Sequence, residues 1–459
     1  MQRSDTIAAV ATAMAGSGIG VIRISGEEAF AIAEKVFRPA KKDKVLHEQE
    51  TYTIHYGKIM DGEEILDEVI VLLMKGPHSY TAEDTVEIDC HGGVYVVKRI
   101  LELVLRKGAR AAEPGEFTKR AFLNGRIDLS QAEAVMDVIQ AKNEYALKSS
   151  IRQLRGSVRD RIRRIREQVL YEIAFIESAL DDPEHISLEG YPKRLQEKIK
   201  ELTEQTEALL KNADEGRILR EGIRTVIIGK PNAGKSSLLN VLAGEERAIV
   251  TDIAGTTRDT LEEQIKLRGL ILHMIDTAGI RKTEDVVEQI GVERAKGSIP
   301  DADLVLYVVD SSTSLDENDR EIMSLLKEQK VIVLLNKTDL PMVTTPEMVE
   351  KVFSRPSVCI SAKEETGFDQ FSQMVEEMFL KGAVSYDEEM HLTNIRHRIS
   401  MEKAAESLEK VMESIRLGMP EDFYSIDLMD AYESLGTIIG ESAGEDLIQE
   451  IFSKFCVGK

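Results

Sequence analysis

The chain has 459 residues, with 81 acidic against 59 basic side chains and a formal charge of −22. This acidity argues against unspecific binding of nucleic acid over the whole surface, because phosphate contacts need local positive charge. The three cysteines lie far apart without metal or disulfide spacing, and the longest apolar runs are too short to cross a bilayer. We therefore expect about three domains, a cytoplasmic location and no signal peptide or membrane span.

The first part of the chain, residues 1–118, alternates short β-like runs with helical patterns, which predicts a small α+β domain. The expected strands lie at residues 20–24, 64–66, 69–74 and 85–89, and the expected helices near residues 27–37 and 94–107. Over residues 119–220, apolar residues recur at helical spacing, for example at Leu170, Ile173 and Ile176. That pattern indicates long bundled helices.

Residues 221–381 alternate strands and helices as an α/β domain does, and residues 382–459 return to helical patterns. The expected C-terminal helices span residues 395–415, 425–440 and 446–455. Because neither helical stretch has much core of its own, we expect both to pack as one bundle. The predicted fold class is multidomain, α/β plus α: an N-terminal α+β domain, a discontinuous helical bundle and an inserted Ras-like P-loop α/β domain.

A phosphate-binding motif opens the α/β segment. The run Gly229-Lys-Pro-Asn-Ala-Gly-Lys-Ser236 follows an apolar strand and precedes a helical pattern, which is the context that a P-loop requires. Its glycines let the backbone fold around an anion, and the helix N-terminus faces the phosphates. Lys235 is expected to reach the terminal phosphates, and the Ser236 hydroxyl to ligate Mg²⁺.

The base-reading segment follows a later apolar strand as Asn336-Lys-Thr-Asp339. The Asp339 carboxylate can accept two hydrogen bonds from guanine, whereas adenine offers no such pair of donors. Asn336 is expected to reach the other edge of the base, and the Lys337 stem to pack along the ring. The loop Ser361-Ala-Lys363 adds a further contact, so the sequence predicts GTP as the ligand.

The switch segments lie between these motifs. Thr257 is the expected second hydroxyl ligand of Mg²⁺, Asp276 holds that ion through its water shell, and Gly279 senses the γ-phosphate. The predicted GTP-binding residues are Asn232, Ala233, Gly234, Lys235, Ser236, Ser237, Thr251, Asp252, Ile253, Ala254, Gly255, Thr256, Thr257, Asp276, Thr277, Ala278, Gly279, Asn336, Lys337, Asp339, Ser361, Ala362 and Lys363.

One position departs from many small GTPases. Ile280 stands where a glutamine orients the attacking water in those proteins, and an aliphatic side chain cannot do this. Another polar group and another positive charge are therefore needed, and the nearby candidates are Glu288, Arg258, Arg281 and Asn232. From spacing alone, the better interpretation of Glu288 is a solvated carboxylate on a helix face.

At this point the chain resembles a known family, the MnmE (TrmE) GTPases that modify uridine in tRNA. Besides the P-loop, the motifs that carry the resemblance are Thr251-Asp-Ile-Ala-Gly-Thr-Thr-Arg-Asp259, Pro114-Gly-Glu-Phe117, Arg120-Ala-Phe-Leu-Asn124, His91-Gly-Gly93 and the terminal Cys456-Val-Gly-Lys459. The resemblance implies a domain for tetrahydrofolate binding and dimerisation over 1–118, a helical domain over 119–220 and 382–459, and a GTPase domain over 221–381.

The resemblance also implies that K⁺ and pairing of two GTPase domains activate hydrolysis. The matching potassium ligands are Asn232, Thr251, Ile253 and Thr256. A monovalent cation there would place positive charge against developing phosphate charge, as an arginine finger does in other GTPases. Glu288 matches the catalytic glutamate of the family, which reverses the interpretation from spacing.

For the N-terminal domain, the resemblance implies a site for 5-formyl-tetrahydrofolate. The matching residues are Arg23, Glu87, Arg126 and Lys459. A carboxylate such as Glu87 can pair with the aminopyrimidine edge of a pterin, and cations suit the glutamate tail. Cys456 would lie close to the one-carbon unit, and both a chemical and a structural role stay open for it.

The implied function is a GTP-driven addition of a carboxymethylaminomethyl or aminomethyl group to carbon 5 of the wobble uridine in certain tRNAs. The implied partners are a second copy of the chain, tRNA and a flavin-dependent protein of the MnmG (GidA) type, in a heterotetramer. Two alternatives stay open: a regulatory GTPase switch without folate chemistry, and a folate-dependent one-carbon enzyme for which GTP is incidental.

A run of arginines adds a candidate tRNA contact. The predicted helix carries arginine at positions 152, 155, 159, 161, 163, 164 and 166. In so acidic a chain this is a candidate face for phosphate contacts. A solvated helix surface with ion pairs is an equal alternative.

Overall fold

The computed structural model describes residues 5–41, 44–211, 213–245, 263–275, 299–379, 392 and 394–459. The chain divides into two compact units. The first consists of residues 1–140, 150–204 and 399–459, and the second of residues 141–149 and 205–398. Within the part of the chain that the structure describes, no helix combines the length and the apolar character needed to span a membrane.

The first unit begins with a mixed sheet. Its described strands are β1 (Ile7–Val10), β2 (Ile19–Ser25), β3 (Phe37–Pro39), β4 (Thr53–Asp61), β5 (Glu64–Met74), β6 (Thr85–His91) and β7 (Arg110–Ala111). Their spatial order is β3-β4-β5-β6-β2-β1-β7. Only the β1–β7 pair among these described strands is parallel.

The two faces of this sheet differ. Side chains alternate along β2, so that Ile22 and Ile24 are buried on one face while Arg23 lies on the other. Helices α1 (Ala29–Val36) and α2 (Val94–Arg106) pack over the buried face and complete an apolar core with it. The Arg23 face therefore remains available for a polar site.

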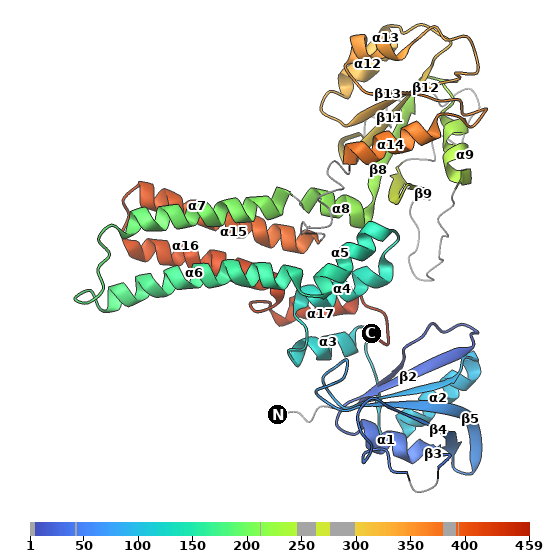
Figure 1. Ribbon diagram of the computed structural model, residues 1–459, viewed down its shortest axis with the longest axis vertical. Coiled ribbons are helices and arrows are strands. Elements are labelled where there is room, and N and C mark those ends of the chain that lie inside the picture. Colours follow the sequence, from blue (N-terminus) through green and yellow to red (C-terminus); the bar gives the residue numbers. More distant parts are fainter. Residues whose placement is uncertain are drawn as a thin grey trace. The chain divides into compact units, whose positions relative to one another are not determined.

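The rest of the first unit is helical. Its helices, some of which continue into the second unit, are α3 (Glu116–Leu123), α4 (Leu129–Gln140), α5 (Glu144–Leu154), α6 (Ser157–Asp181), α7 (Tyr191–Lys211), α15 (Ile395–Arg416), α16 (Glu421–Ile439) and α17 (Glu445–Ser453). The long helices α6 and α16 run side by side (Figure 1). Helical stretches from before and after the α/β segment thus share one bundle, as the sequence predicted.

The second unit contains a largely parallel sheet. Its described strands are β8 (Ile223–Gly229), β9 (Glu263–Leu267), β10 (Leu270–Met274), β11 (Leu304–Asp310), β12 (Val331–Asn336) and β13 (Ser357–Cys359), in the spatial order β13-β12-β11-β8-β10-β9. Among these described strands, only the β9–β10 pair is antiparallel. The other described elements are α8 (Ala213–Glu221), α9 (Lys235–Glu245), the 3₁₀ helix Ile299–Asp301, α12 (Glu317–Leu325), α13 (Pro346–Phe353) and α14 (Phe368–Phe379).

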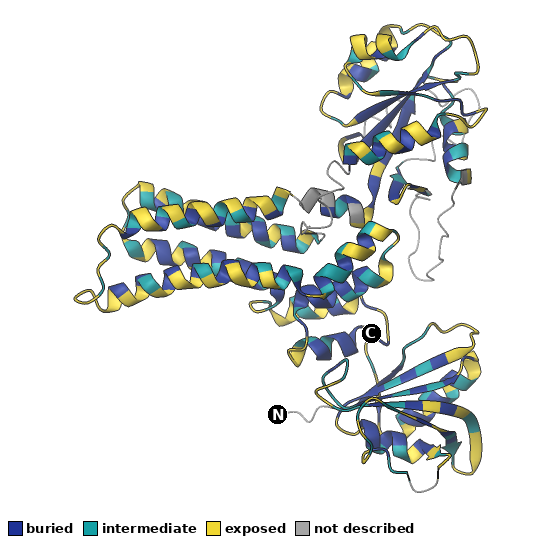
Figure 2. Ribbon diagram, in the orientation of Figure 1, coloured by how far each residue is buried: buried dark blue, intermediate teal, exposed yellow. Residues whose placement is uncertain are grey.

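Both faces of this second sheet are covered. Strands β11 and β12 are buried along almost their whole length, and Figure 2 draws them in dark blue. Alternate residues of β11, such as Leu306 and Tyr307, enter two separate apolar cores. Continuous apolar strands of this kind are typical of parallel sheets with helices on both sides. Ligands of such sheets bind at the carboxyl ends of the strands.

Two expectations for local structure need correction. Leu170, expected on the buried stripe of its helix, is 43% exposed, whereas Val169 and Ile173 are buried. Adjacent helical residues point about 100° apart, so a stripe through Val169 and Ile173 turns Leu170 outward. The separate strands expected at 64–66 and 69–74 are one strand, β5, because the polar residues between them continue the alternation.

Candidate functional site

The phosphate cradle lies at the carboxyl end of β8, where the chain turns into α9. Its backbone has positive φ at Asn232 (59°) and Gly234 (97°), in the region that favours glycine. A Cβ atom on Gly234 would lie 2.1 Å from Asn336 Nδ2. The second glycine of the motif is thus required both by its backbone angle and by the close approach of Asn336.

Asn336, the last residue of β12, joins two loops of the site. Its Nδ2 donates to the Ala233 carbonyl at 2.8 Å, and its Oδ1 accepts from the Ala362 amide at 3.0 Å. The side chain is 2% exposed. Each polar end thus makes one bond inside the protein, while Nδ2 keeps a second hydrogen and Oδ1 a second lone pair. Asn336 holds the cradle and the Ser361–Lys363 loop together, and its expected contact with the edge of the base stays a prediction.

The loop expected to read the base is anchored at its acidic residue. Asp339 Oδ1 accepts a hydrogen bond from the Ser361 hydroxyl at 2.7 Å, and Lys363 Nζ lies 3.9 Å from Asp339 Oδ2. The hydroxyl contact lowers the pKa of Asp339. The carboxylate is therefore ionised at neutral pH and retains acceptor capacity for two donors of a ligand. Lys337 contacts Asp310 at 2.6 Å.

The cradle lysines already interact with the protein. Lys235 Nζ donates to the carbonyls of Gly229 and Lys230 at 2.8 and 2.7 Å, so its ammonium group lies over the mouth of the loop. Lys230 Nζ lies 2.7 Å from Asp316 and 2.6 Å from Asp319. The sequence analysis missed this contact of Lys230. Both carboxylates come from the capping box of α12, which lies outside the known nucleotide-binding motifs.

The donor chemistry of the described cradle residues fits an anion and a cation. Asn232 is exposed, and within the described residues no hydrogen bond engages its carboxamide. An amide oxygen is a suitable ligand for a hard cation. Ser236 and Ser237 lie in the first turn of α9. The other predicted residues of the nucleotide and cation sites lie outside the described residues; these are Thr251, Asp252, Ile253, Ala254, Gly255, Thr256, Thr257, Asp276, Thr277, Ala278, Gly279 and Glu288.

A second polar group lies on the first sheet. Arg23 on β2 faces Glu87 on β6, and their Nε and Oε1 atoms are 2.7 Å apart. The side chains are 14% and 19% exposed, so the pair is sheltered yet reachable. The Arg23 guanidinium also lies 5.3 Å from the Tyr80 ring centroid and 5.6 Å from that of Phe117.

The C-terminal tail reaches the same place. Arg23 Nη1 donates to the Gly458 carbonyl at 3.4 Å. Gly458 has φ of 93°, and a Cβ there would meet the Val10 carbonyl at 2.3 Å, so only glycine permits this close approach. Burial and then the charge of Arg23 lower the pKa of Lys459. The structure thus places Lys459 at the group formed by Arg23 and Glu87.

The cysteines differ in accessibility. Cys456, in the tail, is exposed, and its carbonyl accepts a hydrogen bond from the Gly115 amide at 3.2 Å. Cys90 is buried on the helix-covered face of the sheet, where burial raises the pKa of its thiol to about 11. A buried thiol of this kind is unreactive, whereas the Cys456 sulfur is within reach of a ligand.

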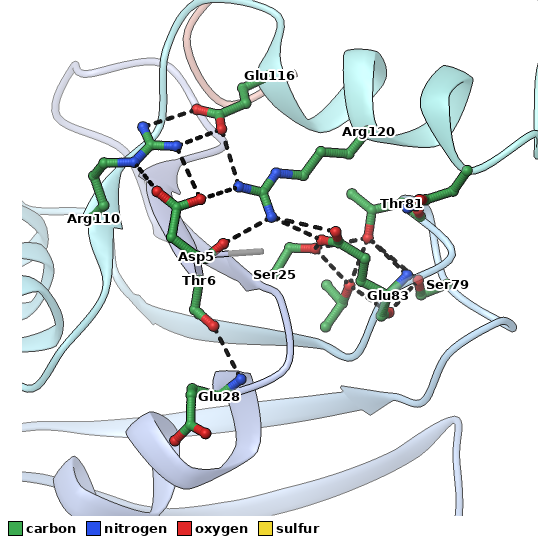
Figure 3. A network of polar contacts seen from close by, with 12 residues as sticks. Asp5, Thr6, Ser25, Glu28, Ser79, Thr81, Glu83, Arg110, Glu116 and Arg120 are labelled. Carbon is green, nitrogen blue, oxygen red and sulfur yellow. Dashed lines mark hydrogen bonds and ion pairs between the residues drawn. The ribbon is translucent and has the colours of Figure 1, made fainter. Parts of the chain in front are cut away.

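A network of charges connects α3 with Asp5, Glu83 and Arg110, and its centre at Arg120 is buried (Figure 3). Arg120 on α3 is 9% exposed and contacts Asp5, Glu83 and Glu116 at 3.0, 3.2 and 3.1 Å. Arg110 also binds Asp5 and Glu116. Sequence analysis singled out the motif that contains Arg120 without giving it a role. Glu116 lies one turn earlier on the same helix, but the helical pattern held no signal for Asp5 and Glu83, which come from two other parts of the chain.

The arginine run on α5 and α6 does not form one uniform face. Arg166 is buried, forms a short contact with Glu441, and lies 3.9 Å from the Tyr432 ring centroid. Arg159 pairs with Asp160 at 2.8 Å. Arg155 and Arg164 are exposed. The structure therefore removes Arg166 from the candidate phosphate-binding face.

Known protein families match most of this chain. The model of the MnmE helical domain matches residues 129–456, and the model of the GTP-binding protein TrmE N-terminus matches residues 6–126. Together, the two matches include the helical bundle, the cradle and the first sheet.

Full-length relatives give the same result. The tRNA modification GTPase MnmE of Lachnoclostridium phytofermentans is 54% identical over 457 residues, with 100% of both chains covered. The proteins of the same name from Acetivibrio thermocellus and Bacillus subtilis are 49% and 45% identical. The match covers 100% of both chains for the first, and 99% of this chain and 100% of its relative for the second.

Proposed function

Because the chain belongs to the MnmE family of tRNA modification GTPases, we propose that it hydrolyses GTP to modify carbon 5 of the wobble uridine in tRNA. The group added is carboxymethylaminomethyl or aminomethyl, with the one-carbon unit taken from a tetrahydrofolate. The partners are a second copy of the chain, tRNA and a flavin-dependent protein of the MnmG type. We also propose that the domain boundaries lie at residues 118, 220 and 381.

One observation supports this proposal most. The match to tRNA modification GTPases runs from end to end of both chains at 54% identity. It includes the cradle on the second sheet, the charged pair on the first sheet and the terminal tail. A regulatory switch that needed only the GTPase domain would leave the Arg23–Glu87 pair and the Lys459 tail without a function.

In the nucleotide site, the described residues have separate tasks. The cradle amides and Lys235 bind the phosphates, and the ionised Asp339 accepts the two guanine donors. Asn336 keeps these two parts at a fixed distance. Ser236 and Thr257 would hold Mg²⁺, with Asp276 supporting its water shell.

Hydrolysis needs further charge near the γ-phosphate. Asn232, Thr251, Ile253 and Thr256 would hold K⁺, which supplies positive charge when bound. The exposed carboxamide of Asn232 fits that task, because oxygen ligands suit such an ion. Glu288 would then orient the attacking water in place of the glutamine that Ile280 replaces.

In the N-terminal site, Glu87 would pair with the aminopyrimidine edge of a reduced folate. Arg23 orients the carboxylate through the 2.7 Å contact, and Arg126 and Lys459 provide positive charge for carboxylates of the ligand. When bound, the folate supplies the one-carbon unit. The exposed Cys456 lies in the segment that brings Lys459 to the site, and a chemical and a structural role both stay open for it.

The experiment measures the modified wobble nucleoside in cells that depend on this chain for it. We expect Arg23→Ala, Glu87→Ala and Asp276→Ala each to lower its level at least tenfold. Arg38→Ala, at an exposed position on β3, is the matched control and should leave the level unchanged. Normal levels in all three site variants would contradict the proposal. Loss with Asp276→Ala alone would favour a GTPase switch without folate chemistry.

A further inference from the structure

Tyr80 lies in the loop between β5 and β6, and two arginines lie close to its ring. Its ring centroid is 5.3 Å from the Arg23 guanidinium carbon and 5.0 Å from that of Arg126. Both distances are within the range of cation–π attraction, which is about 6 Å. A neutral ring thus attracts two cations that would repel each other directly.

The two arginines differ in their charge balance. Arg23 has the Glu87 carboxylate as its counter-ion. Arg126 is exposed, and among the described residues no carboxylate lies within ion-pair distance of it. The Tyr80 ring can hold Arg126 in place without neutralising it. The charge of Arg126 therefore remains available to an anion.

The backbone of Arg126 is fixed by the end of α3. The Gly125 amide donates to the Phe122 carbonyl at 2.9 Å, and the Arg126 amide donates to the Ala121 carbonyl at 2.9 Å. Gly125 has φ of 71°. These bonds form a Schellman motif, which ends a helix in a defined direction. The chain therefore leaves α3 in a fixed direction, which brings Arg126 close to Tyr80.

The Tyr80 loop is in turn held by α3. Asn124 Nδ2 donates to the Thr81 carbonyl at 2.7 Å, and the Tyr80 hydroxyl lies 2.9 Å from Thr118 Oγ1. Arg120 contacts Glu83 in the same loop at 3.2 Å (Figure 3). The motif Arg120-Ala-Phe-Leu-Asn124 thus supplies both the anchor of the loop and the approach to Arg126.

We propose that Tyr80 is a specificity-determining residue of the N-terminal site, where its ring presents Arg126 to a carboxylate of the ligand. Arg120 and Asn124 are positioning residues that hold the Tyr80 loop. The ligand class is a reduced pterin with an anionic tail, so the inference rests on the proposed folate site. Glu87 binds the pterin end of the ligand, and the Tyr80–Arg126 pair binds its anionic tail.

The test titrates the full-length chain with 5-formyl-tetrahydrofolate by calorimetry. We expect Tyr80→Leu and Arg126→Gln each to weaken binding about tenfold, the effect of losing one cation–π contact or one charged hydrogen bond. The double variant should be no weaker than the worse single variant, because both changes remove the same interaction. A loss of about one hundredfold in the double variant would show independent effects and overturn the inference.

Further variants separate this role from a general loss of structure. Tyr80→Phe keeps the ring and should bind within twofold of the wild type. Asn124→Ala should weaken binding in the wild-type background and have no further effect beside Tyr80→Leu. If Arg23→Ala and Glu87→Ala leave the affinity unchanged, the folate site itself is wrong. If these two abolish binding while Tyr80→Leu binds within twofold of the wild type, only the role of Tyr80 is wrong.

Discussion

Replacing Asn336 with alanine removes a buried side chain that joins the cradle to the Ser361–Lys363 loop. The substitution deletes the 2.8 Å bond to the Ala233 carbonyl and the 3.0 Å bond from the Ala362 amide. Ala233 is 2% exposed and Ala362 is 8% exposed, so water can replace neither partner fully. The two loops, which follow β8 and β13, then lose their link, while β12, which carries position 336, stays intact.

The size of the effect follows from these two bonds. A buried polar group that loses its partner costs about 1 to 3 kcal/mol, and two such groups cost about 2 to 4 kcal/mol once some relaxation is allowed. If the nucleotide must restore the lost order, this energy is taken from binding. Since about 1.4 kcal/mol corresponds to a tenfold change, GTP affinity should fall about 30-fold at the lower value.

The assay is a titration of the full-length chain with a fluorescent GTP analogue. Asn318→Ala is the control, because Asn318 is an exposed amide on α12 of the same unit. It should bind within twofold of the wild type. If Asn336→Ala also bound within threefold, the reasoning would be refuted, because the link between the two loops would then not contribute to nucleotide binding.

Three further predictions concern the cradle, the cation and the stability effect of Asp89 on β6. Gly234→Ala should lower GTP affinity at least tenfold in the same titration, because its Cβ would meet Asn336. The control Gly244→Ala adds a Cβ that meets nothing within 4 Å, so it should bind GTP normally. Equal affinities of the two variants would contradict this prediction. GTP hydrolysis should be much faster in KCl than in NaCl, and Asn232→Ala should remove the difference; equal wild-type rates in the two salts would exclude the cation. Burial and then Glu87 raise the pKa of Asp89, so its charged form is disfavoured in the fold, and stability falls as pH rises above the pKa of the unfolded chain. Asp89→Asn should therefore raise the melting temperature at pH 7 but not at pH 3, and a lower value at pH 7 would count against this cause.

Sequence motifs predicted the local structure of the cradle, because one continuous segment forms it. The cradle spacing placed the strand, loop and helix around Gly234, since the P-loop is one continuous segment. The helical patterns also predicted a split bundle. Helix faces were less certain, as Leu170 shows, because an apolar residue beside the buried stripe leaves the periodicity almost unchanged.

Contacts between distant segments could not be predicted. The two hydrogen bonds of Asn336 form because two loops approach each other in the folded chain, and this approach cannot be read from the sequence. Arg120 contacts Asp5 and Glu83 from two other segments, and Tyr80 meets Arg126 because Gly125 ends α3 in one direction. A single sequence specifies such pairs through tertiary packing, which no local pattern reveals.

We propose that GTP turnover in the nucleotide site drives one-carbon chemistry supported by the N-terminal site. The most direct measurement supplies the purified chain, its flavin-dependent partner and unmodified tRNA with a tetrahydrofolate labelled in its one-carbon unit. Label should enter carbon 5 of the wobble uridine only when GTP is hydrolysed, and Arg23→Ala should prevent it. If label entered equally without GTP, or with Arg23→Ala, the two sites would not be coupled in this reaction.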